Sequence, residues 1–112
     1  MQFAEEQEGA VLVLEITETR LEASNAPDLR ELLIHRIENG THQIVLDLKN
    51  VTFMDSSALG ALIGAIKKMG PLGTLALAGA SGPVLQLLKM TRMDKVFQIY
   101  PSATTALAKL GE

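Results

Sequence analysis

The chain has 112 residues, which is enough for one domain with a single hydrophobic core. Hydrophobic residues make up 47% of the sequence, which argues against an intrinsically disordered chain. Ten basic and thirteen acidic residues give a net charge of -3, which argues against a nucleic-acid-binding protein. There is no cysteine, so disulfides and thiol chemistry are excluded. We expect one domain over residues 1–112.

No unbroken apolar run approaches the roughly 20 residues that a membrane-spanning helix needs. The first six residues are acidic rather than basic and lack the apolar core of a signal peptide. Aromatic residues are only 4% of the chain, so its core must be aliphatic. We therefore expect a soluble cytoplasmic protein that does not bind membranes.

The first part of the chain predicts a β-hairpin followed by a helix. Two short strands, Gln2–Glu6 and Val11–Ile16, flank a Gly-Ala turn, and the second strand alternates apolar and β-branched residues. The stretch from Thr17 to Asn25 is polar and irregular. A helix follows it, with Asn25 as the expected N-cap and Pro27 in the first turn. An Asn-Gly pair ends this helix after a stripe of leucines that faces a core.

The rest of the chain alternates apolar strands with single helices. The expected elements are, in order, a central strand at Gln43–Leu48, a helix at Ser57–Met69, a buried strand at Thr74–Ala78, a helix at Val84–Met90, an edge strand at Val96–Tyr100, and a last helix that Ser102 caps and that ends at Leu110. This alternation predicts an α/β fold with a largely parallel sheet.

Three polar residues, Asp55, Ser56 and Ser57, follow an apolar segment and open a helix of small and aliphatic residues. Each residue type is a good helix cap, so a purely structural role accounts for any one of them. A helix start also tolerates an anion such as phosphate. Because one cap is sufficient, the presence of three polar residues leaves a functional role open alongside the structural one.

The sequence gives little support for a metal site, a nucleotide-binding site or a serine hydrolase. The two histidines, His35 and His42, lie in no metal-ligand spacing, so surface histidines are the favoured interpretation over a metal site. Neither of the common glycine-rich nucleotide motifs occurs, and no cofactor is expected. A serine hydrolase is a weak alternative because Ser56 lacks the G-x-S-x-G elbow and has no histidine near it in sequence.

The order of these segments resembles the STAS family, and within it the small single-domain bacterial anti-sigma factor antagonists. The segments that carry the resemblance are Leu21–Pro27, Ile44–Leu48, Val51–Gly60, Leu88–Met90, Val96–Tyr100 and Ala106-Leu107. The resemblance as a whole extends over nearly the whole chain, with these segments in the family's order. The resemblance implies a mixed, mostly parallel sheet of four or five strands with an N-terminal hairpin, and about four helices on its faces.

The resemblance also implies a function without enzymatic activity. In the family, the first serine after the aspartate, here Ser56, is phosphorylated by a partner that is both an anti-sigma factor and a serine kinase. The unphosphorylated form binds this kinase and frees the sigma factor, and a serine phosphatase resets the phosphorylated form. We expect the partner to bind a surface that comprises Glu22, Asn25, Asp55, Ser57 and Ala58, with Asp55 as a contact and Ser57 as the helix cap.

Two residues depart from the family pattern: Ala58 stands where glycine is usual, and Glu22 stands where aspartate is common. A glycine at residue 58 would permit an unusual backbone angle or a close approach by a partner, and alanine would hinder both. The alternative function is a constitutive STAS subunit of another signalling or transport complex, with Ser56 and Ser57 acting only as helix caps.

Overall fold

The computed structural model describes residues 1–111, which form seven short strands and four α-helices. In chain order these are β1 (Phe3–Glu8), β2 (Val11–Ile16), β3 (Arg20–Leu21), α1 (Ala26–Glu38), β4 (Gln43–Asp47), β5 (Phe53–Met54), α2 (Ser56–Met69), β6 (Thr74–Ala78), α3 (Gly82–Met90), the 3-10 helix η1 (Met93–Lys95), β7 (Gln98–Tyr100) and α4 (Ala103–Leu110).

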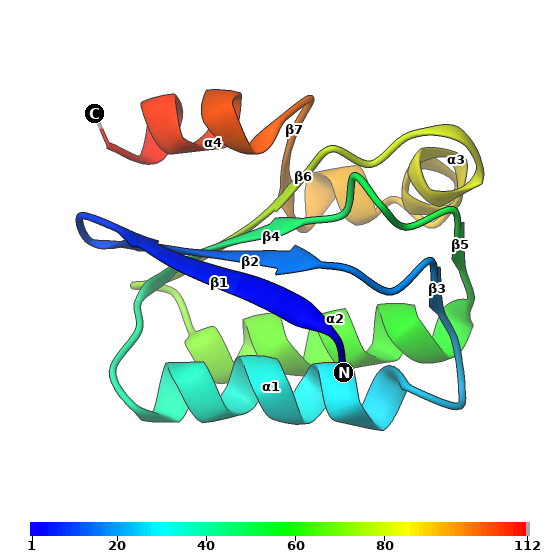
Figure 1. Cartoon of the computed structure of the whole chain (residues 1–112), viewed down its shortest axis with the longest axis horizontal. Helices are drawn as coiled ribbons and strands as arrows, with labels where there is room; N and C mark the ends of the chain where they lie inside the picture. The colour runs from blue at the N-terminus through cyan, green and yellow to red at the C-terminus, as the bar shows by residue number, and fades with distance from the viewer. Residues whose placement is uncertain (112) are drawn as a thin grey trace.

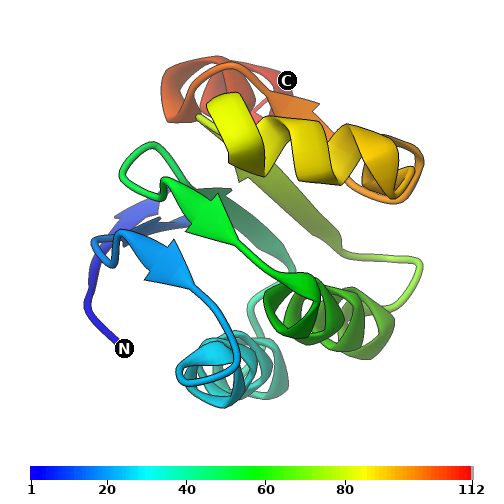
Figure 2. The same ribbon diagram turned by 90° about the vertical axis from the view of Figure 1, so that its right-hand side faces the viewer.

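Five strands form the central sheet in the order β1-β2-β4-β6-β7, in which only the β1–β2 hairpin is antiparallel. Helices α1 and α2 lie side by side below this sheet in Figure 1, and α4 packs on its opposite face. Helix α3 packs against β5 near one end of the sheet, as Figure 2 shows from the side. The predicted α/β fold with a mixed, mostly parallel sheet is confirmed.

Side chains of strand β2 alternate between two apolar clusters, as the two-residue period of a strand requires. Leu12, Leu14 and Ile16 lie in the large cluster, on the side of the sheet that α1 and α2 cover. Val11 and Val13 lie in the smaller cluster, on the side that α4 covers. The neighbouring strand β4 is buried along most of its length, because helices cover both of its faces. This burial explains the nearly continuous apolar run that predicted a central strand.

A second, two-stranded sheet pairs β3 with β5 in parallel, and it positions the start of α2. The stretch from Thr17 to Asn25 was expected to be irregular, and this expectation is wrong at β3. Two residues are too short to show a strand period in the sequence. Leu21 anchors β3 to the main core, because its side chain is fully buried there.

Several predicted boundaries also change, and the central strand β4 ends at Asp47 instead of Leu48. The edge strand expected over Val96–Tyr100 is only Gln98–Tyr100, because η1 and a helical backbone at Val96 precede it. Helix α3 begins at Gly82 instead of Val84, and the first strand runs to Glu8 instead of Glu6. The hairpin, the strand Thr74–Ala78 and the Ser102 cap, which accepts a hydrogen bond from the Thr105 N–H, are as predicted.

An ion pair ties the edge strand β1 to helix α1. Arg36 donates from Nη2 to Glu5 Oε1 at 2.8 Å and from Nε to Oε2 at 3.0 Å. The hydrogen-bonded Arg36 side chain lowers the pKa of the Glu5 carboxyl below its ordinary value. Because folding lowers the pKa of this carboxyl, its ionised form stabilises the folded state at any pH above the unfolded-state pKa. This stabilisation is lost as the pH falls through the folded-state pKa.

We therefore expect Glu5→Gln to lower the free energy of unfolding by about 0.5–1 kcal/mol at neutral pH, the range of a well-formed surface pair. The difference between the variant and the unmodified chain should shrink toward zero as the pH is lowered from 7 to about 3. Urea denaturation at a series of pH values measures both quantities. A difference that stays constant over this range would contradict the assigned role of the pair.

Candidate functional site at the start of helix α2

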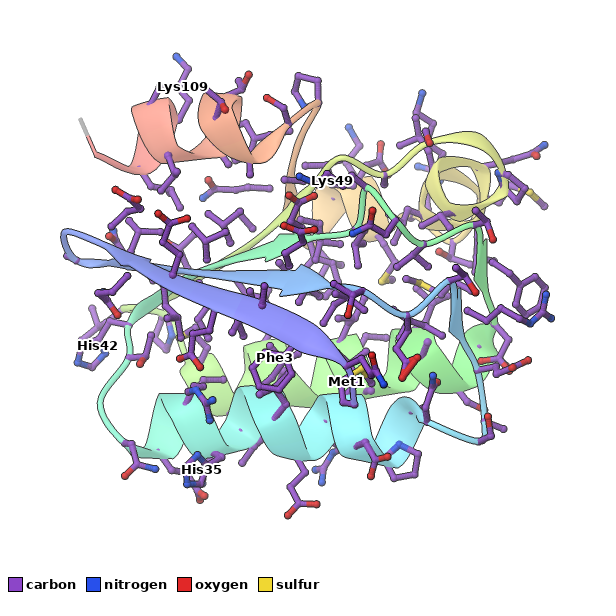
Figure 3. All side chains as sticks on the ribbon, in the orientation of Figure 1. Met1, Phe3, His35, His42, Lys49 and Lys109 are labelled. Carbon is purple, nitrogen blue, oxygen red and sulfur yellow. The ribbon has the colours of Figure 1, made fainter. Side chains whose placement is uncertain are left out.

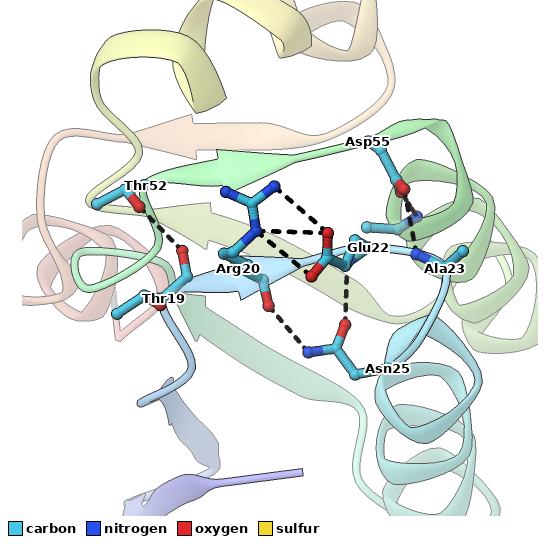
Figure 4. Close-up of polar contacts among 8 residues, drawn as sticks. Thr19, Arg20, Glu22, Ala23, Asn25, Thr52 and Asp55 are labelled. Atoms are coloured by element: carbon cyan, nitrogen blue, oxygen red, sulfur yellow. Dashed lines mark hydrogen bonds and ion pairs between the residues drawn. The ribbon is translucent and has the colours of Figure 1, made fainter.

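The carboxylate of Asp55 joins two elements that are distant in sequence. Its Oδ1 accepts a hydrogen bond from the Ala58 N–H at 3.1 Å, which caps α2, and its Oδ2 accepts from the Ala23 N–H at 3.1 Å (Figure 4). The Asp55 N–H in turn donates to the Leu21 carbonyl at 3.1 Å. Asp55 therefore caps the helix and fastens the loop between β3 and α1 beside it.

The side chain of Asn25 forms hydrogen bonds to the backbone of the same loop. Its Oδ1 accepts from the Glu22 N–H at 2.9 Å, and its Nδ2 donates to the Arg20 carbonyl at 2.9 Å. Asn25 does occupy the N-cap position of α1, but its side chain makes no capping hydrogen bond there. The predicted N-cap position is confirmed, but the side-chain oxygen and nitrogen of Asn25 bond to the backbone of Glu22 and Arg20 instead of capping the helix.

Next to this loop, Arg20 packs its guanidinium over the ring of Phe53, 4.1 Å from the ring centroid. The same group lies 3.4 Å from the carboxylate of Glu22. Figure 4 shows the contact between Arg20 and the half-buried Glu22. Sequence reasoning did not identify Arg20 or Phe53, because their proximity depends on the β3–β5 pairing.

The hydroxyls of Ser56 and Ser57 are not needed to cap the helix. Helix α2 begins at Ser56, one residue earlier than predicted, and Asp55 supplies its side-chain cap. The prediction that Ser57 is the cap is wrong, because Ser57 lies within the first turn of the helix. Both serines are exposed, so Ser56 presents its hydroxyl at a helix N-terminus, where a negative charge is favourable.

Ala58 is fully buried in the main core, so its side chain offers no surface to a partner, and the prediction that it is a contact is not supported. Its backbone is also ordinary: among residues 1–111, Arg92 is the one non-glycine residue with a positive φ. Alanine at this position therefore fits the α-helix without strain. Of the five expected partner-binding residues, the structure brings Glu22, Asn25, Asp55 and Ser57 to one end of the α1–α2 pair.

The histidines lie away from this site. Figure 3 shows His35 on α1 and His42 beyond its end, and both are exposed. Within residues 1–111, no three His, Cys, Asp or Glu side chains lie close enough together to hold a metal ion. None of the helices in this part of the chain is long and apolar enough to cross a membrane.

The sequence profile of the STAS domain matches residues 2–106. The chain belongs to the STAS domain family. An anti-sigma F factor antagonist of Paenibacillus polymyxa is 41% identical over 68 residues, which make up 60% of this chain and 58% of that protein. The chain therefore matches somewhat more than half the length of this relative.

Two solved structures share the fold. An anti-sigma factor antagonist from Mycobacterium paratuberculosis superimposes with a TM-score of 0.89 at 24% identity, covering 99% of this chain and 94% of that one. The phosphorylated form of the Bacillus cell fate determinant SpoIIAA superimposes with a TM-score of 0.74 at 17% identity, covering 97% of this chain and 99% of that one. At this identity, each likeness concerns the fold alone.

Proposed function

We propose that this STAS protein is an anti-sigma factor antagonist: it binds an anti-sigma factor and thereby frees a sigma factor. The observation that carries the proposal is the Ser56 hydroxyl, which is exposed at the start of α2 while Asp55 caps the helix. The relative from Paenibacillus polymyxa, named an anti-sigma F factor antagonist, supports the same class of function.

Phosphorylation of Ser56 is the control that we propose for this binding. A phosphate adds a charge of about -1.5 to -2 and three acceptor oxygens at the helix N-terminus. The N–H groups and the dipole of α2 stabilise that charge locally, so the fold need not rearrange. The Asp55 carboxylate directly precedes Ser56, and Glu22, which pairs with Arg20, lies in the loop that Asp55 contacts, so the phosphate adds about two further negative charges beside existing carboxylates.

The proposed partner is an anti-sigma factor with serine kinase activity, and a serine phosphatase reverses its action. A kinase brings nucleotide phosphates to the acceptor hydroxyl, so a phosphorylated Ser56 would face like charges in the bound state. Like charges brought together at an interface cost several kcal/mol, which is enough to release the complex. In this account the chain is a kinase substrate and a binding protein, not an enzyme, and it acts in the cytoplasm.

The constitutive alternative assigned Ser56 and Ser57 to helix capping. Since Asp55 performs that role, capping no longer accounts for either serine. This favours the regulated function over the constitutive one.

A pull-down from extract of the source cells tests the proposal. The immobilised chain should retain an anti-sigma factor that contains an ATP-binding serine kinase domain, identified by mass spectrometry. Retention should be lost when the bait carries phosphate on Ser56. Recovery of a transporter or lipid-transfer subunit in place of an anti-sigma factor would overturn the proposal.

A further inference from the structure

A shallow depression of about 360 Å³ lies between the first halves of α1 and α2, directly beside the serine pair. Six of its lining residues are uncharged and small or compact, and one is a cation. They are Ala23, Ala26, Pro27, Ser57, Gly60, Ala61 and Arg30. The surface therefore presents a single positive charge against an uncharged floor.

Arg30 reaches this depression by crossing over helix α2 at Gly64. A Cβ atom on Gly64 would lie only 2.8 Å from Arg30 Nε, which is closer than real Cβ contacts allow. The Arg30 side chain can lie this close to α2 only because residue 64 has no side chain. Gly64 has ordinary helical backbone angles, so its glycine is not required by the conformation of the chain.

Within residues 1–111, Arg30 forms no ion pair, although Glu31 and Glu38 line a neighbouring groove with it. Its neighbours three and four residues away on α1 are all uncharged: Ala26, Pro27, Leu33 and Ile34. Among residues 1–111, ion pairs form at Arg20, Arg36, Lys49 and Lys68 but not at Arg30. A guanidinium is planar and donates in a fork that matches a carboxylate, and arginine is enriched at the centres of protein interfaces.

We propose that Arg30 is a docking residue for the anti-sigma factor, and that it receives an aspartate or glutamate side chain of that partner in the α1–α2 depression. This inference rests on the proposed function, because the depression adjoins Ser57 and so extends the surface around Ser56. Gly64 is a positioning residue that acts through Arg30: it lets the guanidinium lie beside the depression.

The variant Gly64→Ala separates a docking role from a structural one. Alanine is favoured over glycine in a helix by about 1 kcal/mol, and the new methyl group displaces only the end of a flexible side chain. The thermal midpoint of the variant should therefore be unchanged or higher, whereas its affinity for the partner should fall. A loss of affinity caused by misfolding would lower both quantities.

The test uses the anti-sigma factor recovered in the pull-down, purified and titrated calorimetrically against the chain. We expect Arg30→Ala to weaken binding by about tenfold, because arginine is enriched among the few interface residues that carry most of the binding energy. Gly64→Ala should weaken it by a similar factor, and the double variant should be no weaker than Arg30→Ala alone, because both changes remove one contact. Lys109→Ala, on α4 across the sheet (Figure 3), is the matched control and should bind as the unmodified chain does.

Equal affinity of Arg30→Ala and the unmodified chain would overturn the docking role and leave the proposed function intact. Additive losses from the two changes would overturn the link between Gly64 and Arg30. If the unmodified chain itself retained no anti-sigma factor, the proposed function would fail instead, so the two failures are distinguishable.

Discussion

Replacing Asp55 with alanine is expected to lower the free energy of unfolding by about 1–2 kcal/mol and to weaken partner binding. The variant loses the cap on the Ala58 N–H, and cap removal typically costs this much. It also releases the Ala23 N–H, so the loop that carries Glu22 loses its side-chain hydrogen bond to the start of α2 and keeps only the backbone bond from the Asp55 N–H to the Leu21 carbonyl. Urea denaturation measures the stability, and titration with the anti-sigma factor measures the affinity.

Ser102→Ala is the matched control, because Ser102 caps α4 through the Thr105 N–H in the same way. It should lose a similar amount of stability and keep full affinity for the partner. Ser57→Ala should change stability by less than about 0.5 kcal/mol, since Ser57 is not the cap. If Asp55→Ala and Ser102→Ala bound the partner equally well, Asp55 would be only a structural cap.

Introducing a fixed negative charge at residue 56 is expected to have the largest effect on binding. Ser56→Asp should weaken the complex with the anti-sigma factor by about a hundredfold, because several kcal/mol of like-charge repulsion appear only in the bound state. The isolated variant should be at least as stable as the unmodified chain, since an acidic residue in the first turn of a helix is favourable. Calorimetric titration and thermal denaturation test these two effects separately.

Two controls accompany this variant. Ser56→Ala removes the hydroxyl without adding charge and should retain most of the affinity. Thr104→Asp adds an acidic residue to the first turn of α4, on the opposite face of the sheet, and should leave binding unchanged. Equal affinities for Ser56→Asp and Ser56→Ala would rule out release by local repulsion.

The sequence predicts the parts of the fold that have a strong hydrophobic period. Strand β4 is apolar along almost its whole length because both faces are buried, and the three- and four-residue spacing in α1 marks a single buried stripe. Such patterns depend only on which side chains are removed from water. The order of strands and helices follows from them, and so does the mostly parallel sheet.

The missed features are those that depend on contacts between distant residues. Strand β3 is two residues long, and its pairing with β5 leaves no period in the sequence. The cap of α2 was misassigned because Asp, Ser and Ser are all good caps, and only the backbone angles at residue 55 decide between them. The link from Asp55 to Ala23 spans 32 residues, so no local pattern indicates it.

The sequence therefore predicts a candidate site at the start of α2, but it does not predict which contact each residue there makes. Ser56 was identified as the acceptor through the family resemblance, and its exposure agrees with that prediction. Asp55 and Asn25 were expected to contact a partner, yet both side chains are engaged in hydrogen bonds that shape the site. Arg30 carries no sequence signal, because its position depends on the absence of a side chain at Gly64 across the helix pair.

Control of anti-sigma factor binding by phosphate on Ser56 can be tested directly. The chain should be incubated with the purified anti-sigma factor and Mg-ATP, the modified residue mapped by mass spectrometry, and the phosphorylated chain titrated against fresh partner. We predict one phosphate, on Ser56, and an affinity at least about a hundredfold lower than that of the unmodified chain. A phosphate on another residue, no phosphate, or an unchanged affinity would contradict this form of control.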